Sequence, residues 1–431
     1  METFPRHLCW ASVFPGLMWM VAPVLAVPDT VIGPVVQAES PLNGTDLTPQ
    51  IIAALEEGTE LPGRWMAEGE VGGTAFSHLL ARPVLFGREV VLLRSFSREG
   101  RVVALEATYA DAGSYFGYFQ EVLPEDLKPR EREREMARRV QARQQEFATE
   151  MAEALEKVRE ELSRQADRPK PKIERHGKVR MLRAEVEEWR MGKLTARLFV
   201  GEGRLVRLVL GKTDEMPAGW MERSFDGETA RERSARLAAT VEKNPDGSVR
   251  VTGIRPIPQG YRPYCGLNTL AMAARHLGLM IDEDWLAAAA GFRNTGSAAG
   301  SDMVSLYHAV AAEAGMGMDR GNSLDETAVK AALAEGRPVI VWRRFCWERN
   351  KLHDRIARRG GKLPDPSSPD EKSTWPGEEA PLHASVLTGY DPGKREVFFL
   401  ESWSGKDQPR RMRMEEMAAT TYLCFIFENR R

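Results

Sequence analysis

A short run of turn residues leading into a helix is the feature of this chain that most constrains its fold. The run extends from Gln259 to Asn268, and the apolar residues after it recur at helical spacing until Gly278. Cys265 is therefore predicted at or just before the first helical turn. Unpaired backbone N–H groups and the positive end of the helix dipole favour an anion there, and such surroundings can lower a thiol pKa from about 8.5 to roughly 3.5–7.5. Cys265 is thus the candidate nucleophile.

Length and charge limit the classes of protein to consider. The 431 residues exceed one ordinary core and predict two or three domains. Lys plus Arg number 60 against 62 Asp plus Glu, so the net charge of -2 offers no overall field for nucleic acid or an anionic membrane. No nucleic-acid partner is expected.

Cysteine usage argues against a disulfide framework or a thiolate metal site. The four cysteines, at positions 9, 265, 346 and 424, are too few and too scattered for either. A bridge between Cys346 and Cys424 is left open. We expect no metal and no cofactor.

The N-terminus carries an export signal. An apolar run over 8–27 leads to the small residues around Ala26, which suit a signal peptidase. We predict a signal peptide over 1–26, with a cut as late as 38, and then a linker over 27–60. An uncleaved anchor and a simple apolar N-terminus are the alternatives. The predicted location is periplasmic or extracellular, with no later membrane span.

Two related β-rich units are predicted at 61–123 and 171–253. The segments 96–105 and 199–208 share a Phe, a Glu-Gly-Arg turn and a Leu at the same spacing, which is typical of a repeated hairpin. Internal duplication explains this, and two unrelated hairpins with similar turns are the alternative. Neither copy carries side chains suited to catalysis.

A long amphipathic helix is predicted between these units, at 124–168. Its apolar residues recur at spacings of three, four or seven, while Glu matches Arg in number on the rest of its surface. Such a stripe favours a coiled-coil contact that forms a dimer or docks on the chain. A solvated spacer helix is the alternative.

The remaining region, 254–431, is predicted to be an α+β domain. Helices are expected near 283–290, 302–314 and 324–335, the last opened by a capping box of Ser323 and Glu326. Strands are expected at 338–343, 383–389, 396–400 and 422–427. Helices first and strands later imply a site between the two halves.

The hairpin around 392–393 brings a carboxylate to a histidine. If the turn is centred there, His383 lies opposite Ser402 with Glu401 beside it, and a shift of one residue places Glu401 opposite His383. Facing Cβ atoms lie about 4.5–5.5 Å apart. A carboxylate there would orient the imidazole and stabilise an imidazolium next to a thiolate.

The order Gln259, Cys265, His383 and Glu401 resembles that of the papain-like cysteine peptidases. The residues around Cys265 and the strand that begins at His383 are closer still to the double-glycine leader peptidases that process bacteriocins. The resemblance covers 254–427. It implies that Cys265 attacks an acyl carbon, His383 carries the proton, and Gln259 with the Cys265 N–H holds the oxyanion. Glu401, or Ser402, would take the third position, where the family usually has Asn or Asp.

The resemblance implies an exported cysteine peptidase that hydrolyses peptide or isopeptide bonds through a thioester, with a peptide or protein as its substrate. An acyltransferase or amidase acting on a cell-envelope substrate is the second hypothesis. A non-catalytic binding scaffold with the same fold is the third. The charged segment 347–380 is predicted to be a lid or a wall of the site, with a disordered insertion as the alternative.

Overall fold

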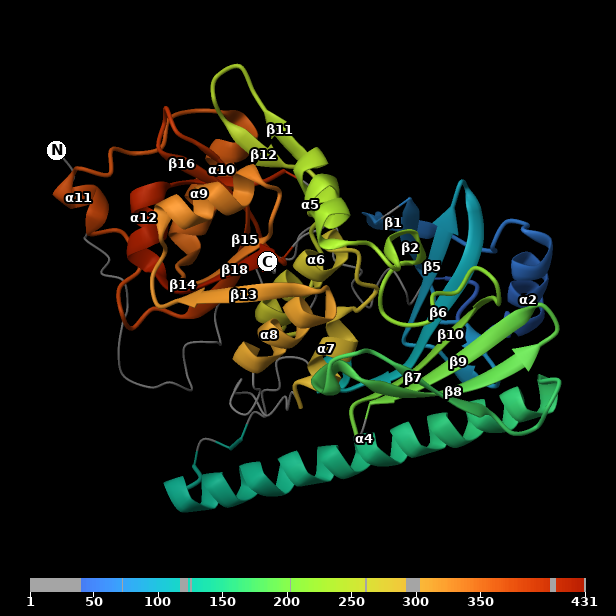
Figure 1. The fold of residues 1–431 in the computed structure, drawn as a ribbon. Helices are drawn as coiled ribbons and strands as arrows, with labels where there is room; N and C mark the ends of the chain where they lie inside the picture. Colours follow the sequence, from blue (N-terminus) through green and yellow to red (C-terminus); the bar gives the residue numbers. More distant parts are fainter. Residues whose placement is uncertain are drawn as a thin grey trace.

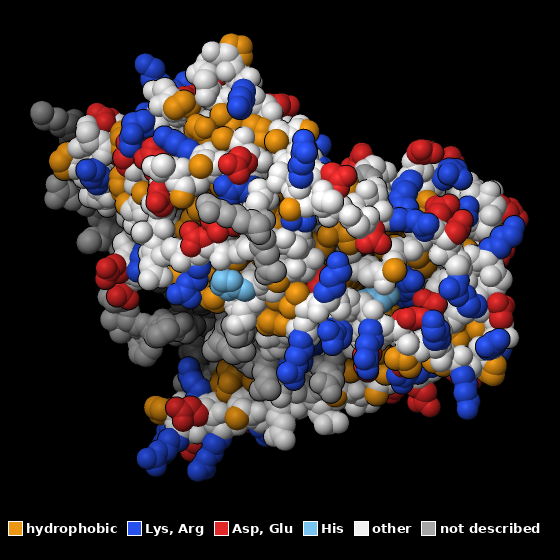
Figure 2. All heavy atoms as spheres, in the orientation of Figure 1, with side chains coloured by type: hydrophobic (Ala, Val, Ile, Leu, Met, Phe, Trp, Pro, Cys, Tyr) orange, Lys and Arg blue, Asp and Glu red, His pale blue; other side chains and the backbone are white. Residues whose placement is uncertain are grey.

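The computed structural model describes residues 40–71, 73–116, 123–124, 126–201, 203–259, 262–291, 303–403 and 408–429. The predicted signal peptide lies outside these residues, and so does Cys9. Within the described ranges, no helix is long and apolar enough to cross a membrane. Basic and acidic side chains are interspersed over the face that Figure 2 shows.

The first half of the chain builds one eight-stranded antiparallel sheet (Figure 1). Its spatial order is β1-β2-β5-β6-β10-β9-β8-β7. The strands are β1 (Trp65–Val71), β2 (Thr74–Leu79), β5 (Leu92–Arg98), β6 (Arg101–Asp111), β7 (Lys172–His176), β8 (Ala184–Met191), β9 (Leu194–Gly201) and β10 (Leu205–Lys212). A small separate hairpin consists of β3 (Val84–Leu85) and β4 (Arg88–Glu89).

The two halves of this sheet come from the two predicted β units, but the last two strands of the second predicted unit, Val241–Lys243 and Val249–Val251, belong to the C-terminal sheet instead. The halves meet at the β6–β10 pair, and the strand order of the second half runs in reverse along the chain. Phe96 faces Ala104, and Phe199 faces Arg207, which are equivalent positions of the repeated segments. The turn of the first hairpin has Glu99 at φ 51° and Gly100 at φ 75°, as a tight hairpin turn requires.

One long helix, α4 (Pro129–Gln165), crosses this sheet and extends beyond it (Figure 1). Its 37 residues make a rod of about 56 Å at about 1.5 Å per residue. It starts later than predicted, at a proline that suits the first helical position. The buried side chains are Phe147, Ala154, Val158 and Leu162. The second half of the helix therefore packs on its own sheet, with α2 (Thr48–Glu57) nearby on the same core, and a dimer contact through α4 stays a prediction.

The C-terminal region has mixed α+β structure, as predicted, with helices before most of its strands (Figure 1). Its antiparallel sheet has the order β11-β12-β15-β14-β18-β13, and β16 and β17 extend it from β15. The strands are β11 (Val241–Lys243), β12 (Val249–Val251), β13 (Met316–Gly321), β14 (Val339–Arg344), β15 (Leu382–Asp391), β16 (Glu396–Leu400), β17 (Arg410–Arg413) and β18 (Thr421–Asn429).

Helices cover this sheet and connect it to the first one. They are α5 (Ala230–Ala239), α6 (Cys265–His276), α7 (Glu283–Ala289), α8 (Met303–Glu313), α9 (Glu326–Ala334), α10 (Trp347–Arg359), α11 (Pro369–Lys372) and α12 (Met414–Thr420), with 3-10 turns η1 (Arg180–Leu182) and η2 (Arg223–Phe225). A further helix, α3 (Ala112–Phe116), directly follows β6 and packs on the core of the first sheet. One buried core contains Phe199 and Leu205 of the first sheet together with Trp285 of α7 and Val341 of β14. The two sheets therefore share a core.

Two local predictions are wrong. The N-cap of α9 is Asp325, whose carboxylate accepts hydrogen bonds from the backbone N–H groups of Thr327 and Ala328, so Ser323 and Glu326 form no capping box. The β15–β16 register also differs from the predicted one. Near the turn the shift is two residues, because the loop between the facing pair Asp391 and Glu396 is longer than a two-residue turn. A bulge between Leu387 and Gly389 then takes back one residue, so that Val386 faces Leu400.

Candidate active site

Cys265 is the first residue of α6. The preceding Tyr264 is the N-cap, with φ -104° and ψ 19°, and its carbonyl accepts the backbone N–H of Asn268 at 2.7 Å. The helix buries nearly all of its other residues because apolar side chains surround it on most sides. Cys265 itself is partly exposed. A thiol at a helix N-terminus with access to solvent is suited to be a nucleophile.

His383 approaches this thiol from β15. It faces Arg343 of β14, and its side chain hydrogen-bonds the Cys265 thiol. Burial alone would raise the pKa of Cys265, but the hydrogen bond and charge of His383 outweigh burial, so the thiol pKa lies below its usual value. The imidazole Nε2 contacts the Glu401 carboxylate, which leaves Nδ1 for the thiol.

Glu401 determines the charge of that imidazole. Burial lowers the pKa of His383, and the carboxylate of Glu401 with the thiol of Cys265 raises it to about 9 overall. Burial raises the pKa of Glu401, while the charges of His383 and Arg343 bring it down to about 2. At neutral pH His383 is therefore an imidazolium and Glu401 a carboxylate, and the lowered pKa of Cys265 favours its thiolate form next to them.

Two further side chains hold the Glu401 carboxylate. Arg343 donates from Nη2 to Oε1 at 2.6 Å, and the Ser385 hydroxyl lies 3.1 Å from both carboxylate oxygens. Arg343 also donates from Nε to the Ser385 hydroxyl at 3.1 Å. Every charged group of this buried cluster thus has a partner, as a buried carboxylate requires.

Aromatic side chains enclose the imidazole. The Trp403 ring stacks on His383 with centroids 4.2 Å apart, and Phe345 lies against the same ring at 5.3 Å. Trp347, the first residue of α10, stacks on Trp403 at 4.9 Å. These rings limit the access of water to the His383–Glu401 contact, which strengthens it.

Gln259 lies in the loop before Cys265, where its backbone and side chain are both held. Its N–H donates to the Ser402 carbonyl at 2.7 Å, and its Oε1 accepts the Ser402 hydroxyl. Its side-chain amide donates to the Arg262 carbonyl at 3.0 Å. Ser402 therefore contacts Gln259, and the carboxylate of Glu401 is the group that contacts the imidazole.

The structure brings Cys265, His383 and Glu401 into one connected row and ties Gln259 to the residue after Glu401. Sequence reasoning missed Arg343 and Ser385. Ser385 lies two residues after His383 on the same face of β15, so strand alternation could have found it. Arg343 has a weaker signal, a charge at the end of an otherwise apolar strand pattern.

The other described cysteines, Cys346 and Cys424, are unlike Cys265. Both are free, so the suggested bridge between them is wrong. Burial raises the pKa of Cys346 to about 11 and that of Cys424 to about 12. They are matched internal references for the reactivity of Cys265.

The segment 347–380 is folded, so the alternative of a disordered insertion is wrong. It forms α10 and α11, and Arg349 of α10 donates from Nε to Glu416 of α12 at 2.9 Å. His353 also lies in α10, and its Nε2 is 3.1 Å from the same carboxylate. Through Trp347, this segment forms part of the aromatic enclosure of His383.

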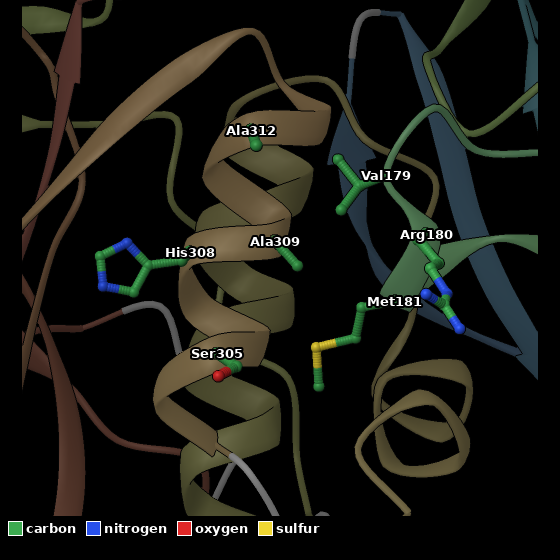
Figure 3. Close-up of a pocket in the computed structure, with 7 residues that line it drawn as sticks. All are labelled: Val179, Arg180, Met181, Ser305, His308, Ala309 and Ala312. Atoms are coloured by element: carbon green, nitrogen blue, oxygen red, sulfur yellow. The ribbon is translucent and has the colours of Figure 1, made fainter.

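A separate pocket lies between η1 and α8 (Figure 3). Its lining is Val179, Arg180, Met181, Ser305, His308, Ala309 and Ala312. None of the four predicted site residues is among these lining residues. The pocket is mostly apolar and is not part of the Cys265 site.

The C-terminal region is also similar to known proteins. Residues 251–425 match the model of the Peptidase_C39 like family. Among solved structures, a C39-like peptidase from Bacillus anthracis is similar at 16% identity and a TM-score of 0.30, with 42% of this chain and 98% of that chain covered. No curated protein matches the chain. The C-terminal region of this chain, residues 251–425, is thus a domain of the Peptidase C39-like family.

Proposed function

We propose that this domain is a cysteine peptidase that hydrolyses peptide or isopeptide bonds through a thioester. The observation that carries the proposal is the connected row of Cys265, His383 and Glu401, which come from α6, β15 and the end of β16. Cys265 at one end is partly exposed, while Glu401 at the other end is 2% exposed. Such a row makes an ion pair available before substrate binds.

In the first step the Cys265 thiolate attacks the carbonyl carbon of the substrate. A C–S bond forms, and the carbonyl electrons move to oxygen as an oxyanion. The His383 imidazolium then protonates the leaving nitrogen, the C–N bond breaks, and an amine departs. Glu401 stabilises the imidazolium before this transfer and keeps the ring in position afterwards.

In the second step neutral His383 takes a proton from water. The resulting hydroxide attacks the thioester carbon, the C–S bond breaks, and a carboxylic acid product leaves, which releases its proton to solvent. The thiolate and imidazolium are thereby restored. The roles of acid and base alternate on one imidazole, which a pKa raised by Glu401 permits near neutral pH.

Gln259 is the proposed oxyanion donor together with the Cys265 backbone N–H. Its position six residues before the nucleophile, and its attachment to Ser402 and Arg262, support this role. One such donor contributes about 10²-fold or more to the rate. The Gln259→Ala change would then lower kcat more than it raises KM.

Peptide cleavage tests the proposal directly. The full-length protein is incubated with a peptide library, and products are identified by mass spectrometry. Cleavage is expected with the wild type and with Cys346→Ser, and is expected to be lost in Cys265→Ser and His383→Ala. Cleavage that persists in Cys265→Ser would refute the mechanism. Peptide binding without cleavage would support the scaffold hypothesis, and incorporation of an added amine into the product would indicate an acyltransferase.

Export remains a proposal that rests on the N-terminal sequence. The apolar run over 8–27 and the small residues at its end support it. Cell fractionation of the full chain and of a chain that starts at residue 27 would test it. The full chain is expected outside the cytoplasm, and the shortened one inside.

A further inference from the structure

A buried network of ion pairs joins the first sheet to the C39-like domain. Arg94 on β5 donates to Glu283 of α7 at 2.8 Å, and it also lies 3.2 Å from Glu68 and 3.3 Å from Glu106. The other contacts are Arg207 with Glu106 (3.3 Å) and Asp282, Arg275 with Glu68 and Glu283 (both 3.9 Å), and Arg262 with Glu283 (3.2 Å), Asp111 (3.7 Å) and Asp284. No side chain in this network is more than 12% exposed.

Such a network is a costly way to join two domains. Removing charges from water costs several kcal/mol per ion, and well-packed apolar side chains often stabilise a fold as well or better. Charged groups add geometric specificity, because a guanidinium donates hydrogen bonds in fixed directions and so restricts where its carboxylate partners can lie. The network is therefore expected to do more than stabilise the contact between the two sheets.

Arg262 gives that reason, because it belongs to the loop between Gln259 and Cys265. Its guanidinium lies in the network, and its Nε donates to the Gln259 carbonyl at 3.2 Å. Its own carbonyl accepts the side-chain amide of Gln259, and its guanidinium lies 4.9 Å from the ring centroid of Tyr264. One side chain thus links the first sheet to both ends of the loop.

Tyr264 provides a second, independent connection. It directly precedes Cys265, it is 1% exposed, and its hydroxyl lies against α3 of the N-terminal half. A Cβ placed on Gly113 would come within 2.0 Å of that hydroxyl. Asp111 caps the same turn, accepting the N–H groups of Gly113 and Ser114 at 3.0 and 2.9 Å, and also faces Arg262.

We propose that the first sheet is part of the active-site framework, and that Arg262 and Tyr264 are the positioning residues through which it holds Gln259 and Cys265. This inference rests on the proposed function only for the identity of the nucleophile. A fixed contact on each side of the loop limits how far the thiol and the oxyanion donor can move. Misplacement of reacting groups by about 1 Å can cost about 10²-fold in rate.

Two variants with matched controls test the proposal. Gly113→Ala adds a methyl group that must displace the Tyr264 ring. Its control is Gly219→Ala, because nothing lies within 4 Å of a Cβ at Gly219. Arg262→Lys keeps the positive charge but removes the planar guanidinium, whose several N–H groups bind the carboxylates of the network and the Gln259 carbonyl together. Its control is Arg197→Lys, since Arg197 is 11% exposed and also binds both a carboxylate, of Glu188 at 2.9 Å, and a carbonyl, of Pro217 at 2.6 Å, while it has no hydrogen bond or ion pair with the described residues of the loop before Cys265.

The measurement is the rate at which iodoacetamide labels Cys265 at pH 6, followed by peptide mapping, together with kcat and KM on a cleaved peptide. Gly113→Ala and Arg262→Lys are expected to slow labelling and lower kcat by about tenfold to 10²-fold with little change in KM. The two controls are expected to stay within about twofold of wild type.

Thermal melts of all four variants separate positioning from stability. Labelling at the wild-type rate in both Gly113→Ala and Arg262→Lys would overturn the proposal, as would an equal loss in Arg197→Lys at equal melting temperature. Labelling needs no substrate, so failure of peptide cleavage in the wild type would refute the proposed function without deciding this inference.

Discussion

At the scale of single residues, the key group of the site is Glu401, at the position where the resemblance to papain-like peptidases implied Asn or Asp. The β15–β16 ladder ends at the pair Val386–Leu400, so it does not itself place Glu401 opposite His383. The longer side chain spans the remaining distance, and Arg343 and Ser385 hold its carboxylate in place. The extra methylene is thus compensated by partners on two neighbouring strands.

Replacing Glu401 by Gln should move the alkaline limit of activity. The charge of Glu401 is the largest contribution that raises the pKa of His383 to about 9, so its loss lets burial lower that pKa. The imidazolium, and with it the ion pair, should then be lost at a lower pH. The pH profile of kcat/KM is expected to fall near pH 9 in the wild type and well below pH 9 in Glu401→Gln.

Glu416→Gln is the matched control for this change. Glu416 is also a buried glutamate in contact with a histidine, His353, but that pair does not contact Cys265. Its profile should follow that of the wild type. An unshifted alkaline limit in Glu401→Gln would contradict the assigned role of the carboxylate.

The same raised pKa affects stability. A histidine whose pKa is raised from 6.5 to about 9 on folding contributes stability that is complete below about pH 6.5 and is lost as the pH rises through about 9. The difference in unfolding free energy between wild type and His383→Ala should shrink across that window, as urea titrations at several pH values would show.

Spacing along the sequence was enough to find the residues proposed to perform the chemistry, but not the residues that hold them in place. Cys265, His383 and Glu401 each follow from a turn, a helix start or a strand pattern. Arg343 could not be assigned, because its partner Glu401 is distant in the chain and only the β14–β15 pairing brings the two together. The role of Ser402 was equally open, since it depends on a contact with Gln259 across the domain.

At the scale of elements, strong periodicity was a good guide and weak propensity was not. The helix at Cys265 and the strand at His383 were predicted with nearly the observed bounds. β13 and β17 were missed, because the first has two glycines and no β-branched residue, and the second is mostly arginine. Both are held in the sheet by neighbouring strands, which a local pattern cannot reveal.

The cap of α9 gives a prediction at this scale. Asp325→Ala removes the carboxylate that accepts two backbone N–H groups and should cost about 1 kcal/mol of unfolding free energy. Ser323→Ala should cost much less, because α9 begins after Asp325. Urea unfolding of the two variants measures the difference, and a larger loss for Ser323→Ala would restore the capping box inferred from sequence.

At the scale of the molecule, the two halves are connected by a common core as well as by ion pairs. Trp285 of α7 packs against Phe199 of β9 and against Trp220, with centroids 5.9 and 5.6 Å apart. Both tryptophans donate their Nε1 to the carbonyl of Leu182. The sequence suggested separate domains, because contacts between distant segments leave no periodic signal.

This shared core predicts cooperative unfolding. Tryptophan fluorescence, to which Trp220 and Trp285 at the contact between the halves contribute, and far-ultraviolet circular dichroism should give coincident urea transitions. Two separated transitions would show that the halves unfold independently. Trp285→Ala should uncouple them, since it removes the central ring of the contact.

The central claim is that Cys265 is a thiolate paired with His383, and its reactivity at pH 6 tests this most directly. Iodoacetamide labelling with peptide mapping compares Cys265 with Cys346 and Cys424 in the same molecule. The lowered pKa of Cys265 predicts labelling at least about tenfold faster than either reference, and loss of that advantage in His383→Ala. Labelling of Cys265 at the rate of Cys346, or an advantage that survives His383→Ala, would contradict the account.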